Sequence, residues 1–263
     1  MKNKAPIGIF DSGVGGTSIW QQVHELLPFE NTIYLADSKN APYGYKSSEE
    51  ITALSIKNTE ALLSMGCKIV VIACNTATTN AISTLRRTFD IPIIGIEPAV
   101  KPAALQTASK SIGILATQGT LSSILFHKTS SKFTKDIKVI EVVGEGLVPL
   151  IESGKMGSEE TIQLLKKYTK PMIKAGIDYL VLGCSHYPHL IPQLKQILPS
   201  QVKILDSGKA VAKNTQATLA SLNLLRKETT PPSIQFYSNA DIETMKFLLR
   251  DYCEEISVEK RDF

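Results

Sequence analysis

The 263-residue sequence lacks the features that mark several classes of protein. No segment approaches the roughly 18 consecutive apolar residues of a membrane span, and the apolar run at Ile7 to Phe10 is too short for a signal peptide. Four cysteines in a chain of this length do not form a disulfide framework. The formal charge of +4 is spread out, without basic runs or aromatic–basic interleaving. We therefore expect a reduced, cytoplasmic protein with neither membrane nor nucleic acid as a partner.

The glycine-rich turn from Asp11 to Gly16, DSGVGG, lacks the signatures of a nucleotide site. It has no lysine at the P-loop position, and its glycines do not follow the GxGxxG spacing. Because glycine has no side chain, the turn can still bring backbone N–H groups close to a small ligand. We interpret it as a ligand-binding turn at the end of the first strand.

The sequence does contain two similar segments in which a cysteine follows a buried strand. Ile69 to Ala73 are apolar and mostly β-branched, as in a parallel strand, and Cys74 comes next. A thiol at this point lies where open α/β sheets bind ligands, and a following helix N-terminus favours the thiolate. The alternative is that Cys74 is a small buried hydrophobic residue. The second segment, Tyr179 to Leu182 followed by Gly183 and Cys184, favours the functional interpretation.

Neighbouring segments repeat at nearly the same offset as the two cysteines, which lie 110 residues apart. IGIF at Ile7 matches IGIL at Ile112, and GIEPA at Gly95 matches KILDSG at Lys203. Each half of the chain then contains strand, helix, strand, helix, cysteine strand, helix and strand in the same order. The chain is therefore predicted to form an α/β fold of two pseudo-symmetric lobes with parallel sheets and an active-site cleft between them.

Two facing thiols suit a reaction that removes a proton from one face of a carbon and returns a proton to the other. The ordinary pKa of a thiol, about 8.5, lets it act as base or acid near neutral pH. One thiolate and one thiol are expected at rest, exchanging roles in each turnover. Several neighbouring groups can bind carboxylates: Ser12, Asn75, Thr76 and Ser185. Asp11 and His186 can tune the thiols or anchor an ammonium group.

Two further residues have two interpretations each. Tyr43 lies in a turn with Pro42 and Gly44, where we expect it to be presented to a ligand rather than buried, the alternative being packing. Glu152, in the helical segment VPLIE, is a supporting catalytic group or, as the residues by themselves favour, a solvated helix carboxylate. Cys67 and Cys253 are expected to be packing residues.

Five motifs together resemble the glutamate racemases of the aspartate/glutamate racemase superfamily: DSGVGG, PYG, ACNTAT, GIEPAVKPA and LGCSHYP. They occur in the family's order over nearly the whole chain. The resemblance implies two flavodoxin-like lobes, with residues 1–97 and 207–263 in the first and 98–206 in the second. It implies interconversion of L- and D-glutamate, without cofactor or metal, that supplies D-glutamate for peptidoglycan. A homodimer is compatible with the resemblance.

The resemblance also implies roles for individual residues. Cys74 takes the α-proton from D-glutamate and Cys184 takes it from L-glutamate, and the helper acids and bases are Asp11, His186 and Glu152. The substrate-binding residues are four pairs: Asp11–Ser12, Tyr43–Gly44, Asn75–Thr76 and Ser185–His186. A cleft that closes by a hinge would shield the carbanion from water.

The sequence departs from the family's pattern at two places. Ser185 stands where the family usually has threonine, which keeps the hydroxyl but removes a methyl group. Residues 143–147, VGEGL, replace the Cys-Pro-aromatic segment that usually precedes the Glu152 helix in the family.

Three alternatives to a glutamate racemase remain at this point. A related two-thiol enzyme could act on aspartate, a hydantoin or maleate, although His186 favours glutamate over aspartate. Cys74, Cys184 and His186 could instead form a three-ligand zinc site in a hydrolase. A glutamate-binding protein without catalytic activity is the third alternative.

Overall fold

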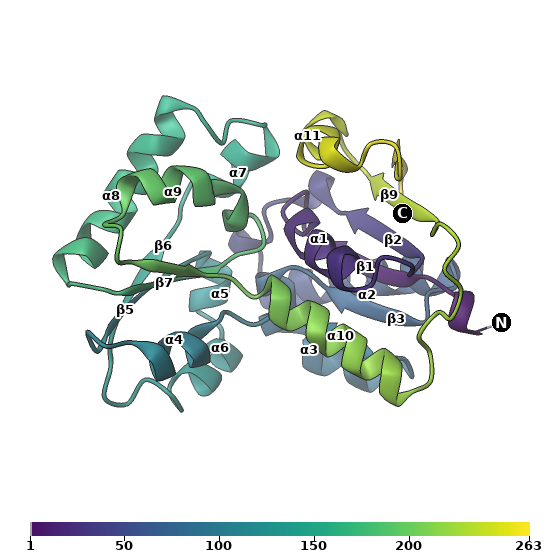
Figure 1. Ribbon diagram of the computed structural model, residues 1–263, viewed down its shortest axis with the longest axis horizontal. Helices are drawn as coiled ribbons and strands as arrows, with labels where there is room; N and C mark the ends of the chain where they lie inside the picture. The colour runs from purple at the N-terminus through teal and green to yellow at the C-terminus, as the bar shows by residue number, and fades with distance from the viewer. Residues whose placement is uncertain (1) are drawn as a thin grey trace.

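The computed structural model describes residues 2–263 and contains two parallel sheets in two lobes that lie side by side (Figure 1). The six-stranded sheet has the order β10-β9-β2-β1-β3-β4, and its strands are β1 (Ile7–Asp11), β2 (Thr32–Ala36), β3 (Ile69–Ile72), β4 (Ile93–Gly95), β9 (Ile234–Ser238) and β10 (Ser257–Lys260). The four-stranded sheet has the order β6-β5-β7-β8, and its strands are β5 (Ser111–Ala116), β6 (Lys138–Val143), β7 (Tyr179–Gly183) and β8 (Lys203–Leu205).

Helices connect the strands in both lobes. The α-helices are α1 (Thr17–Leu26), α2 (Ser48–Ser64), α3 (Asn75–Thr88), α4 (Val100–Gln106), α5 (Gln118–Leu121), α6 (Ile124–Ser130), α7 (Leu147–Glu152), α8 (Glu159–Lys174), α9 (Ile191–Ile197), α10 (Gly208–Ser221) and α11 (Glu243–Leu248). The 3₁₀ turns are η1 (Lys2–Lys4), η2 (Ser38–Asn40), η3 (Tyr43–Tyr45), η4 (Tyr187–Leu190) and η5 (Arg250–Tyr252). Among the described residues, no helix is both long and apolar enough to span a membrane.

Both faces of the six-stranded sheet are buried, which explains the continuous apolar runs of its central strands. Ile7 and Ile9 of β1 pack in the same cluster as Trp20 of α1 and Val211 of α10. Phe10 packs on the opposite face, in the cluster that includes residues of α2 and α3. Alternation along a strand sends successive side chains to opposite faces, so only a strand covered on both sides can be apolar throughout.

The internal repeat is confirmed by the two sheets. β2-β1-β3-β4 in one lobe and β6-β5-β7-β8 in the other have the same order, which is that of flavodoxin-like folds. Helices α2 and α8 end near glycines with positive φ, Gly66 (+80°) and Gly176 (+69°). These glycines lie 110 residues apart, as Cys74 and Cys184 do, and each terminates the helix before a cysteine strand. The fold class predicted from the sequence is confirmed.

The C-terminal segment and two helix positions differ from expectation. After α10, strands β9 and β10 extend the first sheet beside β2, and β10 was not predicted. The segment after Pro98, for which no helix was predicted, contains α4, which packs on β5 and β7. Helix α3 begins at Asn75, immediately after Cys74, although the helical pattern in the sequence is clear only near Ala81.

Candidate active site

The two cysteines predicted to be catalytic line one cavity between the lobes. Cys74 follows β3 and Cys184 follows β7, each at the carboxyl end of the strand beside the central strand of its sheet. Both are buried and neither is in a disulfide. The cavity volume is about 10 Å³, roughly the space for one water molecule. Its walls are Ser12, Pro42, Tyr43, Gly44, Cys74, Asn75, Thr76, Thr117, Val148, Cys184, Ser185 and His186.

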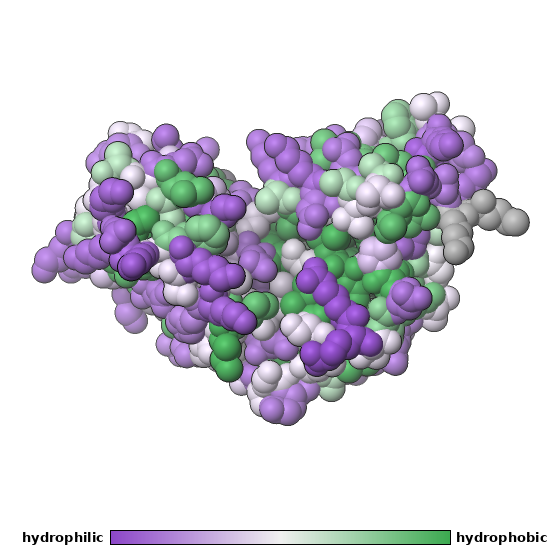
Figure 2. All heavy atoms as spheres, turned by 90° about the horizontal axis from the view of Figure 1, so that it is seen from below, coloured by the Kyte–Doolittle hydropathy of each residue, from purple (hydrophilic) through white to green (hydrophobic). Residues whose placement is uncertain are grey.

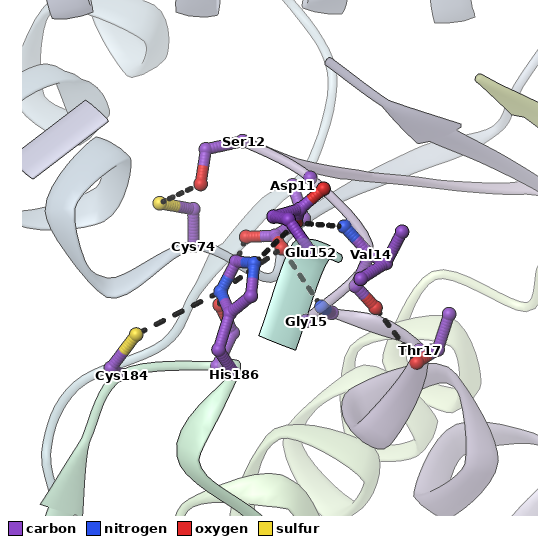
Figure 3. A network of polar contacts seen from close by, with 12 residues as sticks. Asp11, Ser12, Val14, Gly15, Thr17, Cys74, Glu152, Cys184 and His186 are labelled. Carbon is purple, nitrogen blue, oxygen red and sulfur yellow. Dashed lines mark hydrogen bonds and ion pairs between the residues drawn. The ribbon is translucent and has the colours of Figure 1, made fainter. Parts of the chain in front are cut away.

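Cys74 is the N-cap residue of α3. Its sulfur accepts a hydrogen bond from the backbone N–H of Ala77 at 3.4 Å. Its S–H donates to Ser12 Oγ at 3.4 Å (Figure 3). Burial raises the pKa of the Cys74 thiol, and the charge of Asp11 raises it further. The backbone N–H of Ala77, and the Ser12 hydroxyl when it turns to donate to the thiolate, oppose this rise in pKa. Cys74 therefore favours the thiol form when no ligand is bound.

Cys184 has a histidine as its proton partner instead. Its sulfur lies 3.8 Å from Nδ1 of His186, whose Nε2 lies 2.6 Å from Oε1 of Glu152 (Figure 3). Burial by itself lowers the pKa of His186, but the hydrogen bonds with Cys184 and Glu152 outweigh it and hold the pKa well above its ordinary value. The protonated ring of His186 therefore lies between the Cys184 sulfur and the Glu152 carboxylate.

Glu152 is held by the glycine-rich turn of the other lobe. Its Oε1 accepts from the backbone N–H of Val14 at 2.7 Å, and its Oε2 accepts from Ser38 Oγ at 2.9 Å. A Cβ atom on Gly13 would lie 1.9 Å from Oε1 of Glu152, and one on Gly15 would lie 2.3 Å from Nδ1 of His186. The glycines of this turn thus leave room for the Glu152–His186 pair. The interpretation of Glu152 as a solvated carboxylate is wrong, because its carboxylate is engaged across the lobe interface.

Asp11 ends β1 and is completely buried. Its carboxylate accepts hydrogen bonds from Gly16 N–H at 2.8 Å and Ser185 Oγ at 3.0 Å, and Oδ2 lies 4.0 Å from Nδ1 of His186. Burial raises the pKa of Asp11, and the charge of His186 partly offsets this. Ser185 therefore connects the second cysteine loop to the carboxylate of the first lobe.

The polar wall of the cavity contains one residue with unused hydrogen-bonding capacity. Both side-chain amide atoms of Asn75 are buried, and within the described part of the chain neither has a hydrogen-bond partner. Since buried amides are almost always paired, this is where a polar ligand fits. Next to it, Thr76 Oγ1 lies 2.9 Å from Oγ1 of Thr117 in the other lobe. Thr117 was not among the predicted site residues, although the repeat aligns it with the Asp11 turn.

Tyr43 is buried, contrary to expectation, although it does line the cavity. Only 1% of it is exposed, and its hydroxyl donates to Oδ2 of Asp37 at 2.5 Å. Asn58 donates to the same hydroxyl at 3.1 Å. Gly44 reaches the cavity beside it. Of the remaining cysteines, Cys67 is buried as expected, whereas Cys253 is exposed and is not a packing residue.

The geometry gives no support to the zinc alternative. Among residues 2–263, no three His, Cys, Asp or Glu side chains are grouped as metal ligands would be. Nδ1 of His186 is directed at the Cys184 sulfur, and its Nε2 is occupied by Glu152. Neither ring nitrogen is therefore free to bind a metal ion.

Comparisons with known proteins identify the family of the chain. The family model for Asp/Glu/Hydantoin racemase matches residues 7–215. A glutamate racemase of Herpetosiphon aurantiacus is 44% identical over 236 residues, which are 90% of this chain and 93% of the relative. The crystal structure of Escherichia coli glutamate racemase, in complex with L-glutamate and the activator UDP-MurNAc-Ala, superimposes with a TM-score of 0.85 at 32% identity. It covers 97% of this chain and 98% of its own.

A third similar protein is bound to the other enantiomer. The structure of glutamate racemase from Francisella tularensis in complex with D-glutamate has a TM-score of 0.83 and 27% identity to this chain. It covers 99% of this chain and 98% of its own. The chain therefore belongs to the Asp/Glu/Hydantoin racemase family, and within it to the glutamate racemases.

Proposed function

We propose that this enzyme interconverts L- and D-glutamate by moving protons between one carbon and the sulfurs of Cys74 and Cys184. The observation that carries the proposal is that two free thiols, one from each lobe, line one cavity with different proton partners. Relatives bound to L-glutamate and to D-glutamate support the substrate assignment. The D-glutamate formed would serve peptidoglycan synthesis. We place the reaction in the cytoplasm, where thiols remain reduced.

In the L-to-D direction, the Cys184 thiolate takes the α-proton of L-glutamate. The C–H bond breaks, the proton moves to sulfur, and the electron pair remains on the α-carbon and its carboxylate. The Cys74 thiol then gives its proton to the opposite face, leaving Cys184 as thiol and Cys74 as thiolate. The reverse reaction starts from this second form. The raised pKa of Cys74 supports a resting state in which Cys74 holds the proton.

Binding of the dicarboxylate is proposed to use the polar groups around the thiols. The unpaired amide of Asn75 and the hydroxyls of Ser12 and Thr76 donate to carboxylate oxygens, and the Ser185 hydroxyl joins them by turning from Asp11 to the ligand. The N-terminus of α3 adds a favourable field for negative charge. Asp11 provides the negative charge for the ammonium group, and the Tyr43–Gly44 segment closes one wall. No metal or cofactor takes part in these steps.

The lobes are proposed to open for substrate entry, since glutamate is much larger than the space for one water. We divide the chain at residues 97–98 and 206–207, so that residues 1–97 with 207–263 move against 98–206. All strands of each sheet lie within one of these parts. Ser207 Oγ donates to the carbonyl of Glu97, which joins the two crossing segments. Figure 2 shows the outline of the molecule indented between the lobes.

The test is incubation with each glutamate enantiomer in D₂O, without pyridoxal phosphate or metal. We expect loss of optical rotation and entry of deuterium at the α-carbon from both enantiomers. Aspartate, a hydantoin and maleate should not turn over. Binding of glutamate without α-hydrogen exchange would instead identify a non-catalytic binding protein. A homodimer is part of the proposal and would appear as twice the chain mass in sedimentation.

A further inference from the structure

The C-terminal strand β9 delivers a side chain to the loop that forms one wall of the cavity. β2 and β9 are neighbours in the sheet, with Ala36 opposite Ser238, so Asp37 and Asn239 follow at the same end of the sheet (Figure 1). Asn239 Nδ2 donates to Oδ1 of Asp37 at 2.5 Å, and its Oδ1 accepts from the backbone N–H of Lys39 at 2.9 Å. Asn239 lies outside residues 7–215, which the family model matches.

The carboxylate of Asp37 is buried and its neighbours are neutral donors. Only 1% of the residue is exposed. Tyr43 donates to its Oδ2, while Asn239 and Asn40 donate to its Oδ1, the latter at 2.8 Å. A buried carboxylate is tolerated only when its oxygens are well bonded. Loss of Asn239 would therefore leave Asp37 underbonded and would loosen the segment that Asp37 organises.

That segment, residues 38–45, contacts the active site at two points. Pro42, Tyr43 and Gly44 line the cavity. Ser38 donates to Oε2 of Glu152, the partner of His186. The two bonds of Asn239 hold the start of this segment, which is more than 190 residues away in the sequence.

We propose that Asn239 is a positioning residue for racemisation. It fixes Asp37 and the segment of residues 38–45, and in this way it shapes the cavity wall and supports Glu152. It does not contact the cavity itself. This inference rests on the proposed function, because its kinetic part presupposes glutamate racemisation. Its structural part, the order of residues 38–45, is measurable without any activity.

The experiment compares Asn239→Ala, Asn239→Asp and the exchanged pair Asp37→Asn/Asn239→Asp with the unchanged enzyme. We expect Asn239→Ala to raise KM by about tenfold, the effect of losing one hydrogen bond to a charged group, while kcat falls less. The decrease in kcat/KM must be equal for both enantiomers, because their free energies are equal. Amide hydrogen exchange of residues 38–46 should increase. Asn214 is an exposed asparagine on α10, and Asn214→Ala is the matched control. It should change neither KM nor the amide hydrogen exchange of residues 38–46.

The two further variants keep the proposal testable if Asn239→Ala does not fold. Asn239→Asp places two carboxylates together and should be the most impaired, whereas the exchanged pair restores one amide–carboxylate contact and should recover part of the loss in KM. Wild-type KM and wild-type exchange in Asn239→Ala, or no recovery in the exchanged pair, would overturn the inference. Absence of racemisation in the unchanged enzyme overturns the proposed function instead. Hydrogen exchange then still tests whether Asn239 orders residues 38–45.

Discussion

The two cysteine loops occupy equivalent places in two similar sheets, yet their surroundings differ. Cys74 caps a helix of 14 residues and contacts a hydroxyl and a backbone N–H. Cys184 is followed by a 3₁₀ turn and contacts a histidine that is paired with Glu152. The repeat therefore explains where the sulfurs lie, while residues that do not repeat give each sulfur different hydrogen-bond partners. In the proposed reaction one sulfur holds a proton and the other does not, so these partners can be tested one side at a time.

Replacing each thiol is the strongest way to test this comparison. Cys74→Ala and Cys184→Ala should each reduce racemisation by about 10³-fold or more, the effect expected for loss of a general acid or base. In D₂O, any residual α-hydrogen exchange should be confined to D-glutamate in Cys184→Ala and to L-glutamate in Cys74→Ala. NMR of the α-proton measures both. Exchange of the same enantiomer in both variants would contradict the assignment of one face to each cysteine.

A methyl group added to the glycine-rich turn should displace His186 and so disturb its contact with the Cys184 sulfur. Gly13→Ala places a carbon 1.9 Å from Oε1 of Glu152, so the Glu152–His186 pair must move. We expect kcat/KM to fall roughly 100-fold, the scale of a displacement of about 1 Å in a catalytic group. Gly157→Ala is the control, since a Cβ there has no atom within 4 Å and the glycine has no positive φ. Equal effects of the two substitutions would show that the turn does not hold this pair.

Removing the charge of Glu152 should shift the titration of His186. Glu152→Gln keeps the shape but removes one group that raises the pKa of His186, so this pKa falls. Because the pKa of His186 is higher in the folded than in the unfolded chain, where it is about 6.5, protonation of His186 stabilises the fold. This stabilisation is complete at pH values below the unfolded pKa and is lost as the pH rises through the folded pKa. In Glu152→Gln, the loss of this stabilisation and the alkaline decline of kcat/KM should both begin at lower pH than in the unchanged enzyme.

The decrease in kcat/KM that we expect for Glu152→Gln corresponds to the loss of one hydrogen bond between charged groups. We expect kcat/KM to fall about tenfold near neutral pH. NMR of the His186 ring nitrogens measures the pKa directly. Glu160→Gln, at an exposed position on α8, is the control. An unchanged His186 pKa in Glu152→Gln would show that another group keeps the ring protonated.

Local patterns were sufficient to predict the scaffold and the positions of both thiols. The apolar strands before Cys74 and Cys184, and the offset between them, predict two equivalent sheets, and the structure has them. β10 was missed because SVEK is a short, partly exposed edge strand without an apolar pattern. The start of α3 was missed because its cap is a thiol rather than one of the usual capping side chains.

Contacts between distant segments could not be predicted in the same way. The burial of Tyr43 depends on Asp37 and Asn58, which no local pattern connects to it. The bond between Val14 N–H and Glu152 spans 138 positions and forms only when the lobes meet. Sequence patterns indicate which side chains are available at a strand end, whereas the partners of those side chains depend on how the lobes are packed.

The smallest predicted effect concerns the Cys74 side alone. Ser12→Ala removes a hydroxyl that can donate to the Cys74 thiolate and that opposes the rise in the pKa of Cys74, so this pKa should rise further. In the Cys184→Ala background, exchange of D-glutamate at saturating substrate should slow about threefold to tenfold, the range for one neutral hydrogen bond. In the Cys74→Ala background, exchange of L-glutamate should stay unchanged. If both backgrounds slow equally, Ser12 acts on the shared substrate rather than on one sulfur, and the two half-sites are less independent than their contacts indicate.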